Sequence, residues 1–181
     1  MLDDPPVRNV SDQPGTPLDW SAHAEAVLAG VHARPSWKEV ALGLVEDAVP
    51  SLGPDAAVLV REPDGTWPVA AGANLRQVEF GLVVDDDHTL VGLGTKQHPV
   101  AVVPDTDLIR SDLIGAPLAS RRCLLVALVF PLPVLLVIGR PAGPFDKQDV
   151  QAAVGLVERW RWPLASALQR RDLARALQRF A

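Results

Sequence analysis

The chain has 181 residues, which suffices for one domain of ordinary size with extensions. Its net charge of −5 excludes a nucleic-acid surface, which would need clustered Lys and Arg to replace phosphate counterions. Its single cysteine, Cys123, excludes an internal disulfide framework and a multi-cysteine zinc site. We therefore expect a cytoplasmic protein with no nucleic-acid partner and no bound cofactor.

The N-terminal residues divide into a tail and a first helix. Residues 1–15 are rich in proline and aspartate and carry few apolar side chains, so we expect a disordered tail. The tail has no apolar segment typical of a signal peptide. Thr16 and Pro17 then suit the start of a helix whose apolar stripe continues to Arg34. We place this helix inside a domain that spans residues 16–162.

A second helix is predicted by its cap and by its apolar stripe. Ser36 and Glu39 have the spacing of a capping box, in which each side chain accepts a hydrogen bond from the other residue's backbone N–H. Apolar residues then recur at helical spacing, as expected of a helix with one buried face. They are Trp37, Val40, Ala41, Leu44, Val45 and Ala48. Pro50 and Gly53-Pro54 are predicted to end this helix.

Three strands are predicted next. Residues 56–61 and 66–71 flank Pro63-Asp64-Gly65, residue types typical of a tight turn, so they predict a hairpin. Over residues 78–82, apolar side chains alternate with polar or small ones, which predicts a third strand with one buried face. These apolar residues are Val78, Phe80 and Leu82.

The middle of the chain mixes short elements. Residues 85–96, which contain two glycines, predict a loop or a short helix. Residues 100–103 form a short apolar run that predicts a strand. Residues 105–115 have room for one short helix.

The apolar run Cys123–Gly139 raises the question of a membrane segment. It carries no charge, but it is shorter than the roughly 20 residues of a spanning helix. Pro131 and Pro133 at its centre would disrupt a helix. Valine and isoleucine on either side favour two buried strands joined by a turn. We therefore expect a hairpin and no membrane contact.

The last helix is predicted to begin at a capping aspartate and to project. Asp146 suits the N-cap, and Phe145 and Val150 suit a hydrophobic staple. A helix from there to the end would be roughly 50 Å long, which exceeds the breadth of a domain of this size. We expect residues 163–181 to project and to join a partner, most simply a second copy of the chain. The candidate dimerisation residues are Trp160, Leu164, Leu168, Leu173, Leu177 and Phe180.

The order of these elements follows a known pattern over residues 37–71 and 123–168. A helix, a hairpin with a P-D-G turn, an irregular middle, an apolar hairpin and a capped long helix follow one another. This order resembles the GAF family of sensory domains. The resemblance implies an α+β, GAF/PAS-like fold: an antiparallel sheet of about six strands, N- and C-terminal helices on one face, and a small-molecule pocket on the other. It also implies regulatory input to an output domain or a partner signalling protein, usually from a dimer.

The ligand signatures of that family are missing. The sequence lacks the Asn-Lys pair, Phe and Asp-Glu pair of members that bind cyclic nucleotides. Residues 112–117 do not match the Asp-Ile-Pro stretch of bilin-binding members, and Cys123 begins a predicted strand instead of lying in a pocket loop. Related reductases of free methionine sulfoxide use several cysteines, and one cysteine cannot complete their thiol exchange alone.

Polar residues in the middle of the chain are candidate ligand contacts. The resemblance places residues 105–112 in loops that line the pocket, where carboxylates and an arginine can fix a polar ligand. Helix caps and surface ion pairs explain the same residues almost as well. Residues 85–88, Asp-Asp-Asp-His, offer ligands for a metal or haem, but no histidine spacing selects that reading over a solvated loop. The candidate ligand-binding residues are Phe80, His98, Asp105, Asp107, Arg110 and Asp112.

Three functions are compatible with the sequence. The first is a regulatory sensory domain that binds a small molecule and passes the signal through its C-terminal helix. The second is a dimerisation and transmission module without a ligand, and a reductase ranks last. No Ser/His/Asp or Cys/His grouping stands out, so we expect no catalysis. The first two differ in whether residues 85–115 enclose a polar space or pack shut.

Overall fold

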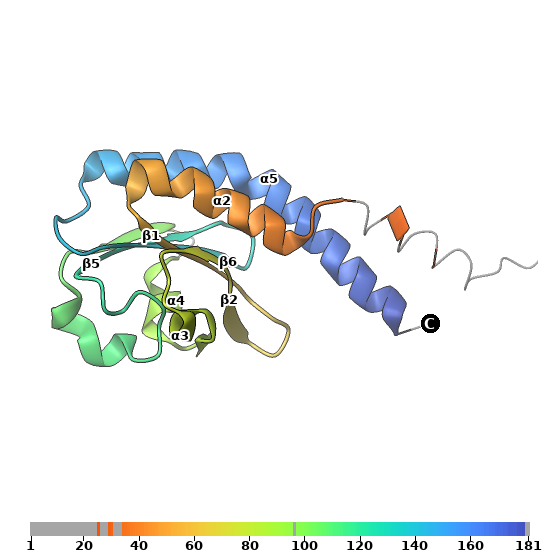
Figure 1. The fold of residues 1–181 in the computed structure, drawn as a ribbon, viewed down its shortest axis with the longest axis horizontal. Helices are drawn as coiled ribbons and strands as arrows, with labels where there is room; N and C mark the ends of the chain where they lie inside the picture. The colour runs from red at the N-terminus through yellow and green to blue at the C-terminus, as the bar shows by residue number, and fades with distance from the viewer. Residues whose placement is uncertain (1–24, 26–28, 31–33, 96, 180–181) are drawn as a thin grey trace, which may run out of the picture.

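The computed structural model describes residues 25, 29–30, 34–95 and 97–179 (Figure 1). The predicted tail, the predicted helix start at Thr16 and the candidate dimerisation residue Phe180 lie outside these residues. Residues 25 and 29–30 are helical. The strands are β1 (Asp55–Val60), β2 (Thr66–Ala73), β3 (Val83–Asp85), β4 (Val100–Val103), β5 (Cys123–Leu128) and β6 (Val134–Arg140). The helices are α2 (Trp37–Leu52), α3 (Gln77–Phe80), α4 (Thr89–Leu93), the 3-10 helix η1 (Thr106–Leu113) and α5 (Lys147–Gln178).

The six strands form one antiparallel sheet in the order β3-β2-β1-β6-β5-β4. Strands β1 and β6 lie at its centre, and all their side chains except that of Arg140 are buried. A strand covered on both faces needs a continuous apolar run, and both strands have one. The sheet confirms the predicted α+β fold.

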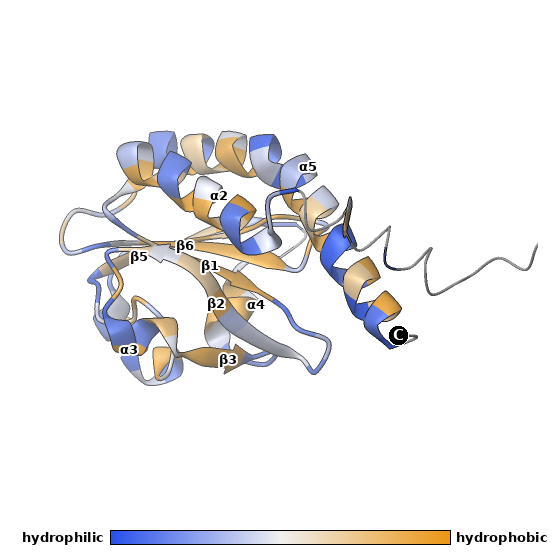
Figure 2. Ribbon diagram, turned by 45° about the vertical axis from the view of Figure 1, so that its right-hand side comes forward, coloured by the Kyte–Doolittle hydropathy of each residue, from blue (hydrophilic) through white to orange (hydrophobic). Residues whose placement is uncertain are grey.

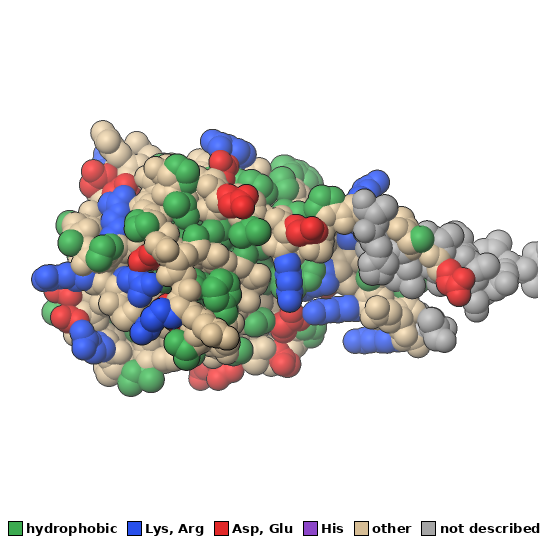
Figure 3. Space-filling model, viewed as in Figure 1, with side chains coloured by type: hydrophobic (Ala, Val, Ile, Leu, Met, Phe, Trp, Pro, Cys, Tyr) green, Lys and Arg blue, Asp and Glu red, His purple; other side chains and the backbone are tan. Residues whose placement is uncertain are grey.

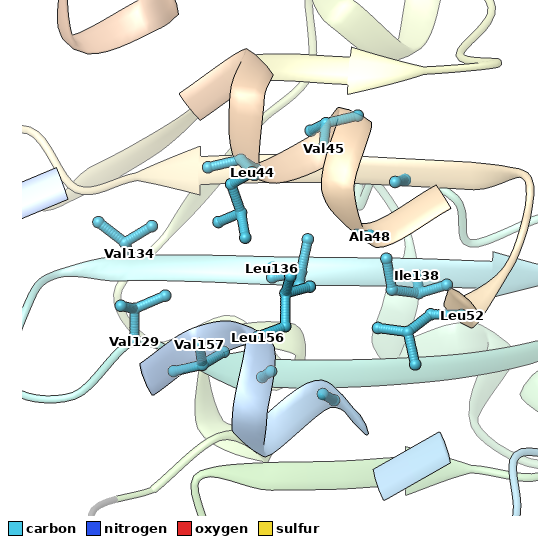
Figure 4. Packing of buried hydrophobic residues seen from close by; sticks show 14 of the residues in the cluster. Leu44, Val45, Ala48, Leu52, Val129, Val134, Leu136, Ile138, Leu156 and Val157 are labelled. Atoms are coloured by element: carbon cyan, nitrogen blue, oxygen red, sulfur yellow. The ribbon is translucent and has the colours of Figure 1, made fainter. Parts of the chain in front are cut away.

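Helices α2 and α5 pack side by side on one face of the sheet (Figures 1 and 2). Figure 4 shows their side chains meeting those of β6, and all of the labelled residues belong to one buried cluster. Full burial of a leucine or valine contributes about 1.5–3 kcal/mol, so this cluster stabilises the helical layer strongly. The labelled residues are Leu44, Val45, Ala48, Leu52, Val129, Val134, Leu136, Ile138, Leu156 and Val157.

The short helices cover the opposite face of the sheet (Figure 1). A second apolar cluster fills the space beneath α4, η1 and the segment that leads into β5. Leu90, Leu113 and Leu118 are fully buried in it. The short helix predicted over 105–115 is confirmed, and of the loop or short helix predicted over 85–96 the structure has the helix α4. Both helices pack on this face because each contributes a buried leucine.

Of the two signals predicted to end α2, Gly53 caps its C-terminus, whereas Pro50 does not end it. The capping box is present: Ser36 accepts from the backbone N–H of Glu39, and Glu39 accepts from that of Ser36. The helix continues through Pro50, however, because a proline in the last turn removes only one hydrogen bond. Continuation also places Leu52, which has no exposed surface, in the core.

The third strand predicted over residues 78–82 is wrong. Residues 77–80 form α3, and only residues 83–85 pair with β2. Val78 and Phe80, expected to be buried, are 64% and 47% exposed. Glu79 between them is only 1% exposed, so the buried side chain is the polar one.

The apolar run 123–139 is a hairpin, as predicted. Strands β5 and β6 pair from Cys123–Arg140 to Leu128–Leu135. They bury nearly all of their side chains within the sheet. None of the helices in the described part of the chain is long and apolar enough to cross a membrane.

Helix α5 begins at the predicted cap and extends beyond the sheet and α2 (Figure 1). Asp146 accepts from the backbone N–H groups of Gln148 and Asp149. Two hydrogen bonds of 2.8 and 2.9 Å from Arg140 hold the Asp149 carboxylate and lower its pKa. The guanidinium of Arg140 also donates to the carbonyl of Leu52, so one side chain joins β6, α2 and α5. The helix continues through Pro163 as one element.

Candidate functional site

A groove of about 450 Å³ lies between α3, η1 and the segment leading into β5. These elements cover the face of the sheet opposite α2 and α5 (Figure 1). This volume lies within the range of small-molecule sites. Most of its lining is apolar or small, with two arginines at the rim and one carboxylate at depth. The lining residues are Arg76, Val78, Glu79, Leu82, Arg110, Leu113, Ile114, Gly115, Ala116, Ala119 and Ser120.

Glu79 is the buried carboxylate of the groove. Its oxygens accept from the backbone N–H of Arg76 at 2.8 Å and from that of Leu118 at 3.1 Å. Burial raises the pKa of Glu79, but these hydrogen bonds, together with the Arg76 and Arg121 side chains, lower it further than burial raises it. The carboxylate is therefore ionised. It holds Leu118 in a left-handed conformation, with φ of 62°, that a non-glycine residue rarely adopts.

Arg121 connects the groove to the sheet. It lies 3.7 Å from the Glu79 carboxylate and donates to the side chain of Asp55 at the start of β1. It also donates to the carbonyl of Asn74 after β2. Gly139 in β6 makes room for it, because a Cβ there would lie 2.7 Å from the Arg121 Cγ. The arginine thus ties three strands to the wall of the groove.

The two rim arginines are paired with acids. Arg76 forms an ion pair with Glu79 at 3.3 Å, and Arg110 forms one with Asp107 in the same turn of η1. Both arginine side chains remain more than half exposed. The rim therefore offers hydrogen-bond donors without a large excess of charge.

The structure brings four of the six predicted ligand-binding residues together in or next to η1. Of these, Arg110 lines the groove. Asp105 caps η1, Asp107 pairs with Arg110, and Asp112 accepts from Ser111, so the acids make the local contacts that helix caps and ion pairs predict.

Phe80 and His98 lie apart from the groove lining. Phe80 is half exposed at the end of α3, and His98 is exposed before β4. The binding role of all six residues stays a prediction.

Three residues of the site were not among the predicted ligand contacts: Arg76, Glu79 and Arg121. Arg76 and Glu79 carry a local signal, since glutamate three residues after the N-cap is the second half of a capping box. Arg121 carries none. Its partner Asp55 lies 66 residues away, and only the sheet brings the two together.

The acidic segment 85–88 serves structural contacts. Asp86 accepts from Arg61 and from the indole N–H of Trp67. His88 Nδ1 accepts from the backbone N–H of Leu90, so its Nε2 carries the proton and donates to the carbonyl of Ile114, 3.0 Å away. That contact positions one edge of the groove. In the described residues, no three His, Cys, Asp or Glu side chains come together as metal ligands would.

The candidate dimerisation residues fall into two sets. Leu164 and Leu168 are buried in the cluster between α2, α5 and the sheet, and the Trp160 indole donates to Asp47 of α2 at 2.9 Å. Leu173 and Leu177 lie further along α5, where Leu173 is 45% exposed. Their role in dimerisation stays a prediction, and only the second set faces away from the core.

Solved structures of GAF domains share this fold. The GAF domain of a phosphoenolpyruvate-protein phosphotransferase (ptsP) from Coxiella burnetii is 16% identical and has a TM-score of 0.59, over 83% of this chain and 95% of its own. The PixJ GAF domain from Thermosynechococcus elongatus is 15% identical with a TM-score of 0.56, over 80% and 94%. The second GAF domain of DevS from Mycobacterium smegmatis is 15% identical with a TM-score of 0.54, over 72% and 96%.

The likeness is one of fold. No family model matches the chain, and no curated protein matches its sequence. The chain has the GAF fold, as the order of its elements predicted.

Proposed function

We propose that the chain is a regulatory sensory domain that binds a small molecule in the groove between α3 and η1 and passes the signal through α5. The observation that carries the proposal is a largely apolar groove built around a buried, ionised Glu79, on the face opposite the long helix. GAF-domain neighbours from a phosphotransferase and a phytochrome support a sensory role. The role proposed is non-catalytic and cytoplasmic. In keeping with this, Cys123 is a buried thiol that donates to the carbonyl of Pro104.

Two neighbouring residues can carry the signal from the face of the short helices to the face of α5. Arg61 and Glu62 follow β1 directly. Arg61 donates to Asp86 after β3, on the side of the short helices, while Glu62 accepts from Arg175 of α5 at 2.7 Å. A ligand shifts the position of α5 only if it binds two arrangements with different affinity. In this proposal, movement of β3 is transmitted through these two residues to the end of α5.

The proposal is tested by detecting a bound molecule and by filling the groove with a large side chain. Native mass spectrometry of the purified chain and a thermal-shift screen of metabolites should reveal a bound or binding molecule. Ala119, which is half-buried in the groove wall, is replaced in an Ala119→Trp variant that should lose the response. The matched control is Ala152→Trp on the exposed side of α5, which should keep it. A folded protein with neither extra mass nor any thermal shift would refute the proposal.

The second candidate is a dimerisation and transmission module without a ligand. The packing beneath the groove favours it, because Leu90, Leu113 and Leu118 leave the inner space of that face filled. Trp162, which is 78% exposed on α5, is a large apolar side chain suited to a partner helix. The partner of this module would be a second copy of the chain, and an output domain or a partner signalling protein would receive the signal.

A further inference from the structure

A second cavity, of about 290 Å³, lies on the helical side of the sheet. It is formed where the N-terminus of α2 meets the distal half of α5, the place where α5 leaves the body of the domain. Figure 3 shows Lys and Arg side chains gathered there. Four arginines line the cavity against one acid, Glu39. The residues that matter for the argument are Arg34, Ser36, Trp37, Arg170, Arg171 and Arg175.

Arg171 is the central side chain of this cavity. It is only 8% exposed, and its guanidinium lies 5.3 Å from the centre of the Trp37 ring. Its Nε donates to Asp172 at 2.9 Å. Its Nη1 is buried and has no hydrogen-bond acceptor among the described residues. A buried cationic donor without an acceptor is destabilising, so this position favours an added acceptor.

The neighbouring acids do not accept a hydrogen bond from the Arg171 Nη1. Glu62 lies 3.6 Å from the Arg171 Nη1, but both its oxygens accept from Arg175, at 2.7 and 3.2 Å. Glu39 accepts from the backbone N–H of Ser36 at 2.6 Å as part of the α2 capping box. Each carboxylate is therefore already engaged.

Arg170 forms no ion pair with the described residues. It donates to the hydroxyl of Ser166 at 2.8 Å and to the carbonyl of Pro35 at 3.3 Å, which are both neutral acceptors. The sixteen-residue α2 also points its N-terminus at the cavity, and the peptide dipoles there favour negative charge. The cavity thus combines Arg170, which donates to neutral acceptors, with a favourable helix end.

We propose that this cavity binds a small oxyanion, a molecule with a phosphate or carboxylate group, between Arg170 and Arg171. Guanidinium groups recognise both oxyanions through planar, charge-assisted hydrogen bonds, and the anion would supply the acceptor that Arg171 lacks. Because the cavity is shared by α2 and α5, a bound anion holds the distal half of α5 against the domain. This site lies on the opposite face from the groove and does not depend on a ligand there.

Inorganic phosphate is the probe. It is titrated into the full chain at constant ionic strength, with chloride as the balancing anion, and tryptophan fluorescence is followed. We expect a saturable change, since Trp37 lines the cavity, and we expect Trp37→Phe to remove it. Arg170→Gln and Arg171→Gln should each weaken binding at least tenfold. Arg122→Gln, at an exposed arginine before β5, is the matched control and should bind as the unmodified chain does.

A second experiment, with lipid vesicles, distinguishes the source of the oxyanion. Vesicles of phosphatidylglycerol that bind the chain, and fail to bind both arginine variants, would assign a lipid headgroup. Phosphate binding without vesicle binding would assign a free anion. If Arg171→Gln does not fold, Arg170→Gln decides the matter. The proposal is overturned if phosphate acts no differently from chloride, or if the arginine variants bind it with unchanged affinity.

Discussion

Asp86 joins the turn after β3 to the hairpin of β1 and β2 with one carboxylate. Its Oδ1 accepts from Arg61 Nε and from Trp67 Nε1, both at 2.7 Å, and its Oδ2 accepts from Arg61 Nη2. Gly65 permits the approach, because its φ of +87° suits the turn and a Cβ there would lie 3.1 Å from Asp86 Oδ2. The P-D-G turn predicted from sequence thus has a second role, which is to leave room for a distant acid.

These contacts predict how stability depends on pH. The hydrogen bonds from Arg61 and Trp67 lower the pKa of Asp86 from its ordinary value of 3.8 to about 2. Because the pKa is lower in the folded state, the ionised group stabilises the fold above a pH of about 4, and this stabilisation is lost as the pH falls toward 2. Urea unfolding should therefore show Asp86→Asn to be less stable than the unmodified chain at pH 6. The difference should shrink at pH 3, and a difference that stays constant would contradict the assignment.

At the scale of single elements, the sequence predicted what local chemistry determines. The caps at Ser36 and Asp146 and the turn at 63–65 need only residues that lie close together in the chain. The wrong prediction of a strand at residues 78–82 also has a local cause. Apolar alternation suggested a strand, but the capping contacts between Arg76 and Glu79 form a helical turn, and Glu79 is drawn inward to bind Leu118.

Two helical glycines predict opposite effects of one substitution. In α2, a Cβ on Gly43 would lie 2.5 Å from the Trp160 ring, which Asp47 holds by a hydrogen bond. In α5, a Cβ on Gly155 would meet nothing within 4 Å. Gly155→Ala should therefore raise the free energy of unfolding by about 0.5–1 kcal/mol through helix propensity. Gly43→Ala should lower it by about 1–3 kcal/mol through overpacking.

Chemical denaturation of the Gly43→Ala and Gly155→Ala variants measures both changes in the free energy of unfolding. Because both substitutions add the same methyl group to a helix, each serves as the control of the other. Equal stabilisation by both would show that α2 and α5 do not approach each other as closely as Gly43 and Trp160 require.

At the scale of the whole molecule, the order of elements was sufficient for the fold but insufficient for the site. Five of the six strands and the helical layer follow from helix capping and from the hydrophobic pattern, whereas β3 was not predicted. The groove depends instead on pairs such as Glu79 with Leu118 and Arg121 with Asp55, which are 39 and 66 residues apart. Arg110 was predicted because its segment follows the family pattern, whereas no single-sequence signal links such distant partners.

The burial of α5 also changes how dimerisation is best tested. Leu164 and Leu168 belong to the core, so a truncation after Pro163 would remove buried side chains as well as any partner surface. Trp162 and Leu173 are 78% and 45% exposed and lie eleven residues apart, which places them on the same side of a helix. They are therefore the candidate partner surface that can be altered without disturbing the core.

We expect the chain to form a dimer through this side of α5, and Trp162→Glu with Leu173→Glu to make it a monomer. Two exposed apolar side chains one above the other suit a second copy of the same helix, and a carboxylate at each position would place like charges in contact. Light scattering coupled to size-exclusion chromatography gives the mass. The control is Leu108→Glu, since Leu108 is 79% exposed on η1 and far from α5, and this variant should remain a dimer. A chain that is monomeric before substitution, or a double variant of unchanged mass, would contradict the role of α5 in dimerisation.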